Sequence, residues 1–398
     1  MNIRITPGLL SGKTKAIPSK SQAHRMLICA AFAQAPTRLV CSQTNRDIQA
    51  TAQCLTALGA DIHRTEEGYE IHPAQAIPTQ ATLPCRDSGS TLRFLLPVVG
   101  ALGVDATFML EGRLAQRPLS PLWEEMERMG CCLSRPTPDT IRCQGKLKPG
   151  VYQVDGGISS QFITGLLFAA ALIPGVSRIQ ITGQLQSRPY VDMTRQAMAR
   201  FGCPTDHFQV TGGQPFHTPG TVEIEGDWSN GSFFLAAQAL GNPVTVENLA
   251  VDSPQGDRAV VQILPQLENH CEIDAGDIPD LVPILAVVAA ARHGAVFRHI
   301  RRLRLKESDR VATVCAMLNA LGARAESDED FLIVFPAPLT GGTVDSANDH
   351  RIAMSAAIAA TVCTGPVTIL GAECVEKSDP QFWAEYRRLG GTYEQYLW

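Results

Sequence analysis

The chain has 398 residues, more than one hydrophobic core usually serves, so two domains are expected. Its 39 acidic and 34 basic side chains give a net charge of −5, which argues against a protein that binds chiefly nucleic acid or an anionic membrane. Twelve cysteines without a CxxC pair, and the lack of a signal-like or membrane-spanning apolar run, predict free thiols in a cytoplasmic protein.

The predicted elements form an internal repeat. In each unit a small or polar cluster opens an apolar helix that ends at Gly or Pro, and an amphipathic helix follows. Apolar helices are expected at 19–33, 88–103, 159–175, 229–241, 278–294 and 348–365, amphipathic helices at 47–60, 120–130, 191–202, 257–269, 307–323 and 379–391, and strands at 69–73, 152–157, 178–182, 221–226, 331–336 and 366–370.

Six such units fit two domains of three units each. The apolar helices should be buried and the amphipathic helices should cover them. The starts of the apolar helices are about 70 residues apart, except for a step of about 50 residues after the fourth. A pair of strands is therefore expected to be missing from the fourth unit.

Basic and hydroxyl side chains gather at the starts of these helices. Ser21 and Arg25 are four residues apart and so lie on one helix face, with Lys20 beside them. Gly89 would let backbone N–H groups approach an anion closely. Because a helix N-terminus itself favours phosphate or carboxylate, these starts predict an anion site. Comparable groups in other units are Arg117, Ser159, Ser160, Gln161, Ser187, Tyr190, His350, Arg351 and Lys377.

Two carboxylates need a separate account. Asp280 opens an almost wholly apolar helix, where it either caps the helix or, among cations, serves as a general base towards a hydroxyl. Glu307 lies between Lys306 and Arg310, where it is either a spacer between ion pairs or part of a site.

Ten short strings occur in one order: PSKSxxxR (18–25), SGSTLR (88–93), RPL (117–119), SSQF (159–162), SRPYVDM (187–193), QGD (255–257), IPD (278–280), LKESDR (305–310), NDHR (348–351) and EKSDP (376–380). As a set they resemble the enolpyruvyl transferases, in particular the 3-phosphoshikimate 1-carboxyvinyltransferase family. The resemblance implies a two-domain, inside-out α/β barrel-like fold. Each domain would hold three βαβαββ units, six repeats in all, with the active site in the interdomain cleft. Residues 1–18 with 229–398 would form one domain and 19–228 the other.

The resemblance also implies a reaction, transfer of the enolpyruvyl group of phosphoenolpyruvate to the 5-hydroxyl of shikimate 3-phosphate with release of phosphate. It implies these two small molecules as partners, a monomer, and no cofactor, metal, nucleic acid or membrane. Shikimate 3-phosphate would be held by Lys20, Ser21, Arg25, Ser159, Ser160, Gln161, Ser187, Tyr190, Asp280 and Lys306. Phosphoenolpyruvate would be held by Lys20, Gly89, Arg117, Gln161, Arg310, Arg351 and Lys377. The catalytic residues would be Asp280, Glu307, Lys20 and Lys306, with Asp280 taking the hydroxyl proton and Glu307 or a lysine protonating the methylene carbon.

Two positions depart from the family pattern. Asp87 and Arg302 stand where the family usually has asparagine, and Arg302 is left out of the predicted site. One alternative is the UDP-N-acetylglucosamine enolpyruvyl transferase, which carries a loop cysteine where this chain has Gly112. The alternative of another class is a non-catalytic polyanion-binding protein, but an aromatic content of 6% offers it few stacking platforms.

Overall fold

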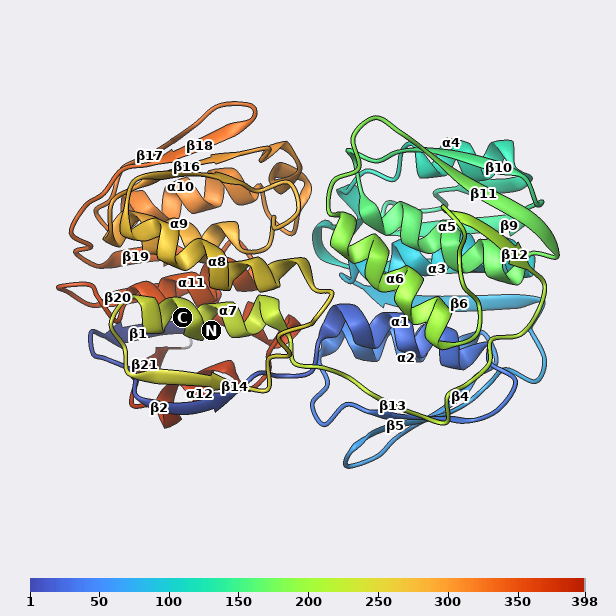
Figure 1. Cartoon of the computed structure of the whole chain (residues 1–398), viewed down its shortest axis with the longest axis horizontal. Helices are drawn as coiled ribbons and strands as arrows, with labels where there is room; N and C mark the ends of the chain where they lie inside the picture. The colour runs from blue at the N-terminus through green and yellow to red at the C-terminus, as the bar shows by residue number, and fades with distance from the viewer. Residues whose placement is uncertain (397–398) are drawn as a thin grey trace. The chain divides into compact units, whose positions relative to one another are not determined.

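The computed structural model describes residues 1–396, which divide into two compact units. Unit 1 comprises Met1–Ile17 and the chain from Gly226 onward, and unit 2 comprises Pro18–Glu225. Each unit has a hydrophobic core of its own. Figure 1 shows the helices and strands of both units.

The apolar helices form where the polar clusters predict their starts. Unit 2 contains α1 (Lys20–Ala31), α3 (Gly89–Leu102) and α5 (Ser160–Leu172), and unit 1 contains α7 (Trp228–Ala239), α9 (Val282–Ala291) and α11 (His350–Ala359). Side chains of the preceding residue cap several of them: Ser19, Ser88, Ser159, Asp227 and Asp349 each accept a hydrogen bond from a backbone N–H of the first turn. The helices are almost wholly buried, as their apolar character on all sides predicts.

Five of the six expected amphipathic helices are present within residues 1–396. They are α2 (Arg46–Ala57), α4 (Leu122–Arg128), α6 (Arg188–Arg200), α10 (Arg310–Ala320) and α12 (Phe382–Arg388). The prediction of one continuous helix at 257–269 is wrong, because that segment consists of η2 (Gly256–Ala259), α8 (Val260–Ile263) and η3 (Leu264–Glu268). Pro265 lies at the start of η3, and a proline ring removes a backbone donor and clashes with the preceding turn.

Four sheets share one pattern, a parallel pair followed by two antiparallel neighbours. In unit 2 these are β13 (Thr221–Glu223), β3 (Thr37–Val40), β5 (Gly68–His72), β4 (Asp61–Arg64), and β6 (Gln80–Arg86), β7 (Asp105–Leu110), β9 (Thr140–Gly145), β8 (Cys131–Ser134). In unit 1 they are β15 (Cys271–Asp274), β16 (Ala295–Arg298), β18 (Phe331–Val334), β17 (Ala325–Ser327), and β19 (Gly342–Asp345), β20 (Val367–Leu370), β1 (Asn2–Thr6), β21 (Thr392–Tyr396).

The remaining two sheets are smaller. In unit 2, β10 (Val151–Asp155), β11 (Gly175–Thr182) and β12 (Gln209–Gly212) lie side by side. In unit 1, β14 (Val244–Glu247) pairs only with β2 (Gly12–Lys15) among the described strands, so the fourth repeat lacks an antiparallel pair, as its shorter length predicts.

Two strands pair with partners that belong to a different repeat in chain order. β2 precedes α1 in the sequence but pairs with β14, which follows α7. Conversely, β13 precedes α7 but pairs with β3, which follows α1. The chain therefore passes from unit 1 to unit 2 between these elements and later returns.

The cysteines within residues 1–396 are free thiols, and most are buried, as predicted. No described helix combines the length and the apolar character that crossing a bilayer requires.

Candidate active site

In unit 1 the carboxylate of Asp280 is surrounded by three cations. Arg310 donates to its Oδ1 at 2.7 Å, Lys306 Nζ lies 3.5 Å from the same oxygen, and Arg351 Nη2 lies 3.2 Å from Oδ2. α9 begins only at Val282, and Asp280 does not cap it. Of the two roles that the sequence leaves open for this carboxylate, helix capping is therefore wrong.

Arg310 is fully buried and its guanidinium is divided among three carboxylates. Besides Asp280, it donates to Glu307 Oε2 at 2.7 Å and, through Nε, to Asp349 Oδ2 at 2.9 Å. Asp349 also caps α11 through the N–H of Arg351. Because three acids face three cations, this cluster is close to neutral in charge as it stands.

The surroundings set the protonation of the two central groups. Burial alone would raise the pKa of Asp280, but the charges of Arg351, Lys306 and Arg310 outweigh it and hold this pKa well below its usual range. Burial lowers the pKa of Lys306 to about 8, and the attraction of Asp280 only partly opposes that effect. Asp280 is thus ionised, whereas Lys306 loses its proton as the pH rises through about 8.

The other predicted residues of unit 1 lie on neighbouring elements. Glu307 precedes α10, which begins at Arg310 after the capping residue Asp309. Lys377 is buried on η5 (Ala372–Lys377), which packs against α11, the helix that carries Arg351. Arg301 and Arg304, which are not among the predicted site residues, pair with exposed or half-buried acids, Glu329 and Asp309.

In unit 2 a buried arginine has only neutral partners among its described contacts. Arg25 Nε donates to Thr194 Oγ1 at 2.8 Å, Nη1 donates to the Ser21 carbonyl at 2.6 Å and Nη2 donates to the Tyr190 carbonyl at 2.8 Å. Burial lowers its pKa to about 10. A buried cation without a carboxylate partner favours a bound anion.

The two predicted residues at the start of α1 and α3 have distinct partners. Lys20 Nζ lies 3.0 Å from Asp47 Oδ2, on α2. A Cβ added to Gly89 would lie 2.7 Å from Arg117 Nη1. Gly89 therefore makes room for the guanidinium of Arg117, a role that the sequence does not reveal.

A further contact joins the starts of α3 and α5. Arg93 donates to Gln161 Oε1 at 2.8 Å and to the Pro118 carbonyl at 3.1 Å. Gln161 Nε2 in turn donates to Ser90 Oγ at 3.0 Å. Arg93 thus orients the side-chain amide of Gln161 and holds the backbone at Pro118, the residue after Arg117.

The predicted hydroxyl residues of unit 2 stand at the starts of α5 and α6. Ser159 caps α5 and Ser160 is its first residue. Ser187 precedes α6 in the left-handed conformation, with φ of 53°, and Tyr190 lies in the first turn of that helix. Arg25 connects this region to α1 through the Tyr190 carbonyl.

The sequence predictions missed three residues that hold predicted ones in place: Asp47, Arg93 and Asp349. Each acts on a residue well separated from it in the sequence, by 27, 68 and 39 residues. Asp349 had a detectable signal, since Asp before a helix is a typical cap. Nothing in the sequence indicates the partners of Asp47 and Arg93.

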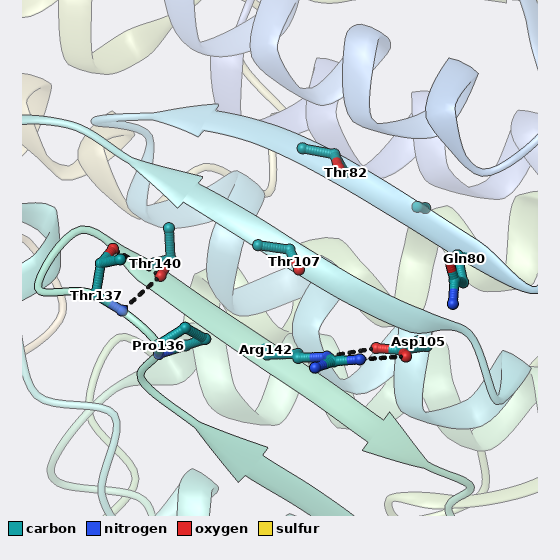
Figure 2. Close-up of a pocket in the computed structure, with 9 residues that line it drawn as sticks. Gln80, Thr82, Asp105, Thr107, Pro136, Thr137, Thr140 and Arg142 are labelled. Atoms are coloured by element: carbon teal, nitrogen blue, oxygen red, sulfur yellow. Dashed lines mark hydrogen bonds and ion pairs between the residues drawn. The ribbon is translucent and has the colours of Figure 1, made fainter.

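An open pocket lies elsewhere in unit 2, on one face of the β6–β7–β9 part of its sheet (Figure 2). Its volume is about 480 Å³. Its charged groups neutralise each other, because Arg142 binds Asp105 through two hydrogen bonds of 2.9 and 2.7 Å. None of the predicted site residues lines this pocket. Nor do residues 1–396 hold a group of three or more His, Cys, Asp or Glu suited to a metal ion.

Comparison with known proteins decides the family. A family model described as EPSP synthase (3-phosphoshikimate 1-carboxyvinyltransferase) matches residues 5–278 and 265–386. The 3-phosphoshikimate 1-carboxyvinyltransferase of Clostridium kluyveri is 39% identical over 99% of this chain and 98% of its own length. The chain belongs to the EPSP synthase family. The corresponding enzyme of Clostridium beijerinckii is 36% identical over 99% of both chains.

Solved structures agree on the fold. The EPSP synthase structure from Acinetobacter baumannii covers 99% of this chain and all of its own, with a TM-score of 0.79 at 23% identity. The fold is therefore the mixed α/β fold of these structures. Membership in the family carries 3-phosphoshikimate 1-carboxyvinyltransferase activity, a transferase reaction of the shikimate pathway in aromatic amino acid biosynthesis. These matches favour that activity over both alternatives considered from the sequence.

Proposed function

We propose that the Asp280 cluster of unit 1 and the Arg25 region of unit 2 together carry the reaction of the family. The protein would transfer the enolpyruvyl group of phosphoenolpyruvate to the 5-hydroxyl of shikimate 3-phosphate and release inorganic phosphate. The proposal includes the finer fold, an inside-out arrangement of six βαβαββ repeats in two domains, 1–18 with 229–398 and 19–228, with the substrates in the interdomain cleft. The sheet pattern shared by four of the repeats and the two compact units support it.

We assign shikimate 3-phosphate chiefly to unit 2. Arg25 supports this assignment, because its charge is buried among hydroxyl and carbonyl oxygens and a phosphate would neutralise it. The binding residues would be Lys20, Ser21, Arg25, Ser159, Ser160, Gln161, Ser187 and Tyr190, joined by Asp280 and Lys306 of unit 1. Phosphoenolpyruvate would be held by Lys20, Gly89, Arg117, Gln161, Arg310, Arg351 and Lys377.

Asp280 would act as the base. It takes the proton of the 5-hydroxyl while that oxygen bonds to C2 of phosphoenolpyruvate, and Glu307, Lys20 or Lys306 delivers a proton to C3. The resulting tetrahedral intermediate then loses a proton from C3 as the C2–O bond to phosphate breaks. The observation that carries this assignment is an ionised carboxylate held among three cations.

The low pKa of Asp280 makes it a weak base before substrates bind. The carboxylate and phosphate of phosphoenolpyruvate would compete for the positive charge of Arg310 and Arg351. As these cations turn to the substrate, their hold on Asp280 weakens and its basicity rises. Binding of phosphoenolpyruvate would therefore raise the basicity of Asp280, so that the hydroxyl proton is removed only when this substrate is present.

Phosphate release from shikimate 3-phosphate and phosphoenolpyruvate tests the function. The full-length protein should release phosphate only when both substrates are present, and no release at any pH between 6 and 9 would refute it. Asp280→Asn tests the role of the base. It should slow turnover by at least about a hundredfold while either Kd changes far less, and an equal loss of affinity would limit Asp280 to its binding role.

We also propose that the protein is a monomer, since each unit closes a hydrophobic core of its own. Light scattering after size exclusion should give a mass near 42.9 kDa, and twice that mass would contradict the proposal.

A further inference from the structure

A buried row of hydrogen bonds joins α1, α2 and α3. His24 Nδ1 lies 2.7 Å from Thr51 Oγ1, and Thr51 Oγ1 lies 2.7 Å from Thr91 Oγ1. Thr91 Oγ1 donates to Ser88 Oγ at 2.8 Å. These four residues, which we call the His24 relay, are at most 1% exposed. Because water cannot replace a lost partner there, each link constrains the helices that carry it.

One end of the relay meets the start of α3. Ser88 caps this helix by accepting from the backbone N–H of Thr91, so the relay and the cap share both residues. The next residue is Gly89, whose lack of a side chain leaves space for Arg117. The position of this first turn therefore decides where Gly89 lies.

The other end meets the start of α1. His24 is one turn beyond Lys20 and adjacent to Arg25. Asp47, whose carboxylate binds Lys20, lies beside the relay, since its carbonyl oxygen is 3.5 Å from Thr91 Oγ1. The relay thus spans the distance between Lys20 and the first turn of α3.

The protonation of the relay follows from its burial. Burial lowers the pKa of His24 well below its usual range, and the charges of Lys20 and Arg25 lower it further, so the imidazole is neutral. Since Thr91 gives its hydroxyl proton to Ser88, Thr51 donates to Thr91 and the Nδ1–H of His24 donates to Thr51. Nε2 is then an acceptor, and it has no hydrogen-bond partner within residues 1–396.

We propose that His24 is a positioning residue, which through Thr51 and Thr91 holds the first turn of α3 at a fixed distance from the first turn of α1. This role keeps Lys20 and Gly89, two proposed contacts of phosphoenolpyruvate, at the spacing that the binding of this substrate needs. The proposal rests on the function proposed above.

Thr51 offers a matched pair of variants. Thr51→Val keeps the shape of the side chain and removes the hydroxyl, whereas Thr51→Ser keeps the hydroxyl. Thr51→Val removes the hydrogen bonds to both His24 and Thr91. With this variant kcat/KM for phosphoenolpyruvate should fall about tenfold, while KM for shikimate 3-phosphate, whose proposed contacts include Lys20 but not Gly89, changes by a clearly smaller factor. Thr51→Ser should stay within about twofold of the unaltered protein in both. Equal losses for both substrates, or no difference between the two variants, would overturn the positioning role.

A second measurement needs neither turnover nor the folding of Thr51→Val. In protein labelled with ¹⁵N-histidine, the His24 signals are assigned by their absence from His24→Asn. They should show a neutral ring with its proton on Nδ1 at pH 6, and a protonated ring or a proton on Nε2 would overturn the relay. If the unaltered protein released no phosphate, the proposed function would fail, and this spectrum would still decide whether the relay exists.

Discussion

Asp349 offers the sharpest test of the Asp280 cluster. Its Oδ2 accepts from Arg310 Nε at 2.9 Å and from Ser308 Oγ at 3.0 Å, while Oδ1 accepts from the N–H of Arg351 at 3.0 Å. Asp349→Asn keeps the helix cap, because asparagine caps as well as aspartate. The amide NH₂ would then face Arg310 Nε, a donor, so the variant removes the ion pair and leaves one N–H of a fully buried guanidinium without an acceptor.

The expected loss follows from the burial of both partners. Removing one member of a buried ion pair costs about 3 to 5 kcal/mol, and Arg310 keeps Asp280 and Glu307, so we expect about 3 kcal/mol. That loss corresponds to a roughly hundredfold fall in the folding equilibrium of unit 1. Urea unfolding followed by the fluorescence of Trp228 and Trp383, both buried in unit 1, would measure it.

Asp309→Asn is the matched control. Asp309 also caps a helix, α10, and its ion pair with Arg304 at 3.4 Å is partly exposed. The same chemical change there should cost less than about 0.5 kcal/mol. If Asp349→Asn unfolded at the same urea concentration as Asp309→Asn, the three-carboxylate account of Arg310 would be refuted.

Three further predictions concern single groups. Gly89→Ala should displace the guanidinium of Arg117 and raise KM for phosphoenolpyruvate about fivefold with an unchanged urea midpoint, and an unchanged KM would contradict the contact. Lys306 has a pKa of about 8, so kcat/KM should fall as its ammonium is lost above that pH. Lys306→Arg should move this fall to a pH at least about one unit higher. If the fall stayed at the same pH, Lys306 would not be the group that titrates. Burial raises the pKa of Asp379 to about 6, so its ionisation destabilises the fold as pH rises from about 4 to 6. Asp379→Asn should remove that dependence of the urea midpoint on pH. A pH profile parallel to that of the unaltered protein would refute the assignment to Asp379.

Local signals explain what could be predicted from the sequence. The starts of α1, α3 and α5 follow from serines that cap the next turn, and their burial follows from apolar side chains all round. The break within 257–269 follows from Pro265, a residue visible in the sequence whose effect the amphipathic pattern obscured.

Partners that lie far apart in the chain explain what could not be predicted. Asp280 looks like a helix cap in the sequence, and only the tertiary contacts with Arg310 and Arg351 show that it is a carboxylate among cations. Likewise, no local pattern indicates that Arg93 holds Gln161. The reason is physical, since such contacts depend on how buried helices pack rather than on neighbouring residues.

The sheet β19–β20–β1–β21 has a consequence for biosynthesis. Strand β1, with the buried residues Ile3 and Ile5, leaves the ribosome before the other strands of its sheet, yet it pairs with β20 and β21, which are made more than 350 residues later. At typical rates of synthesis it must wait roughly 20 to 70 s for these partners. Unit 2, whose residues lie between β1 and these strands in the sequence, can finish folding during this interval. An apolar strand without a partner is prone to aggregate, so nascent unit 1 is where we expect chaperones to bind.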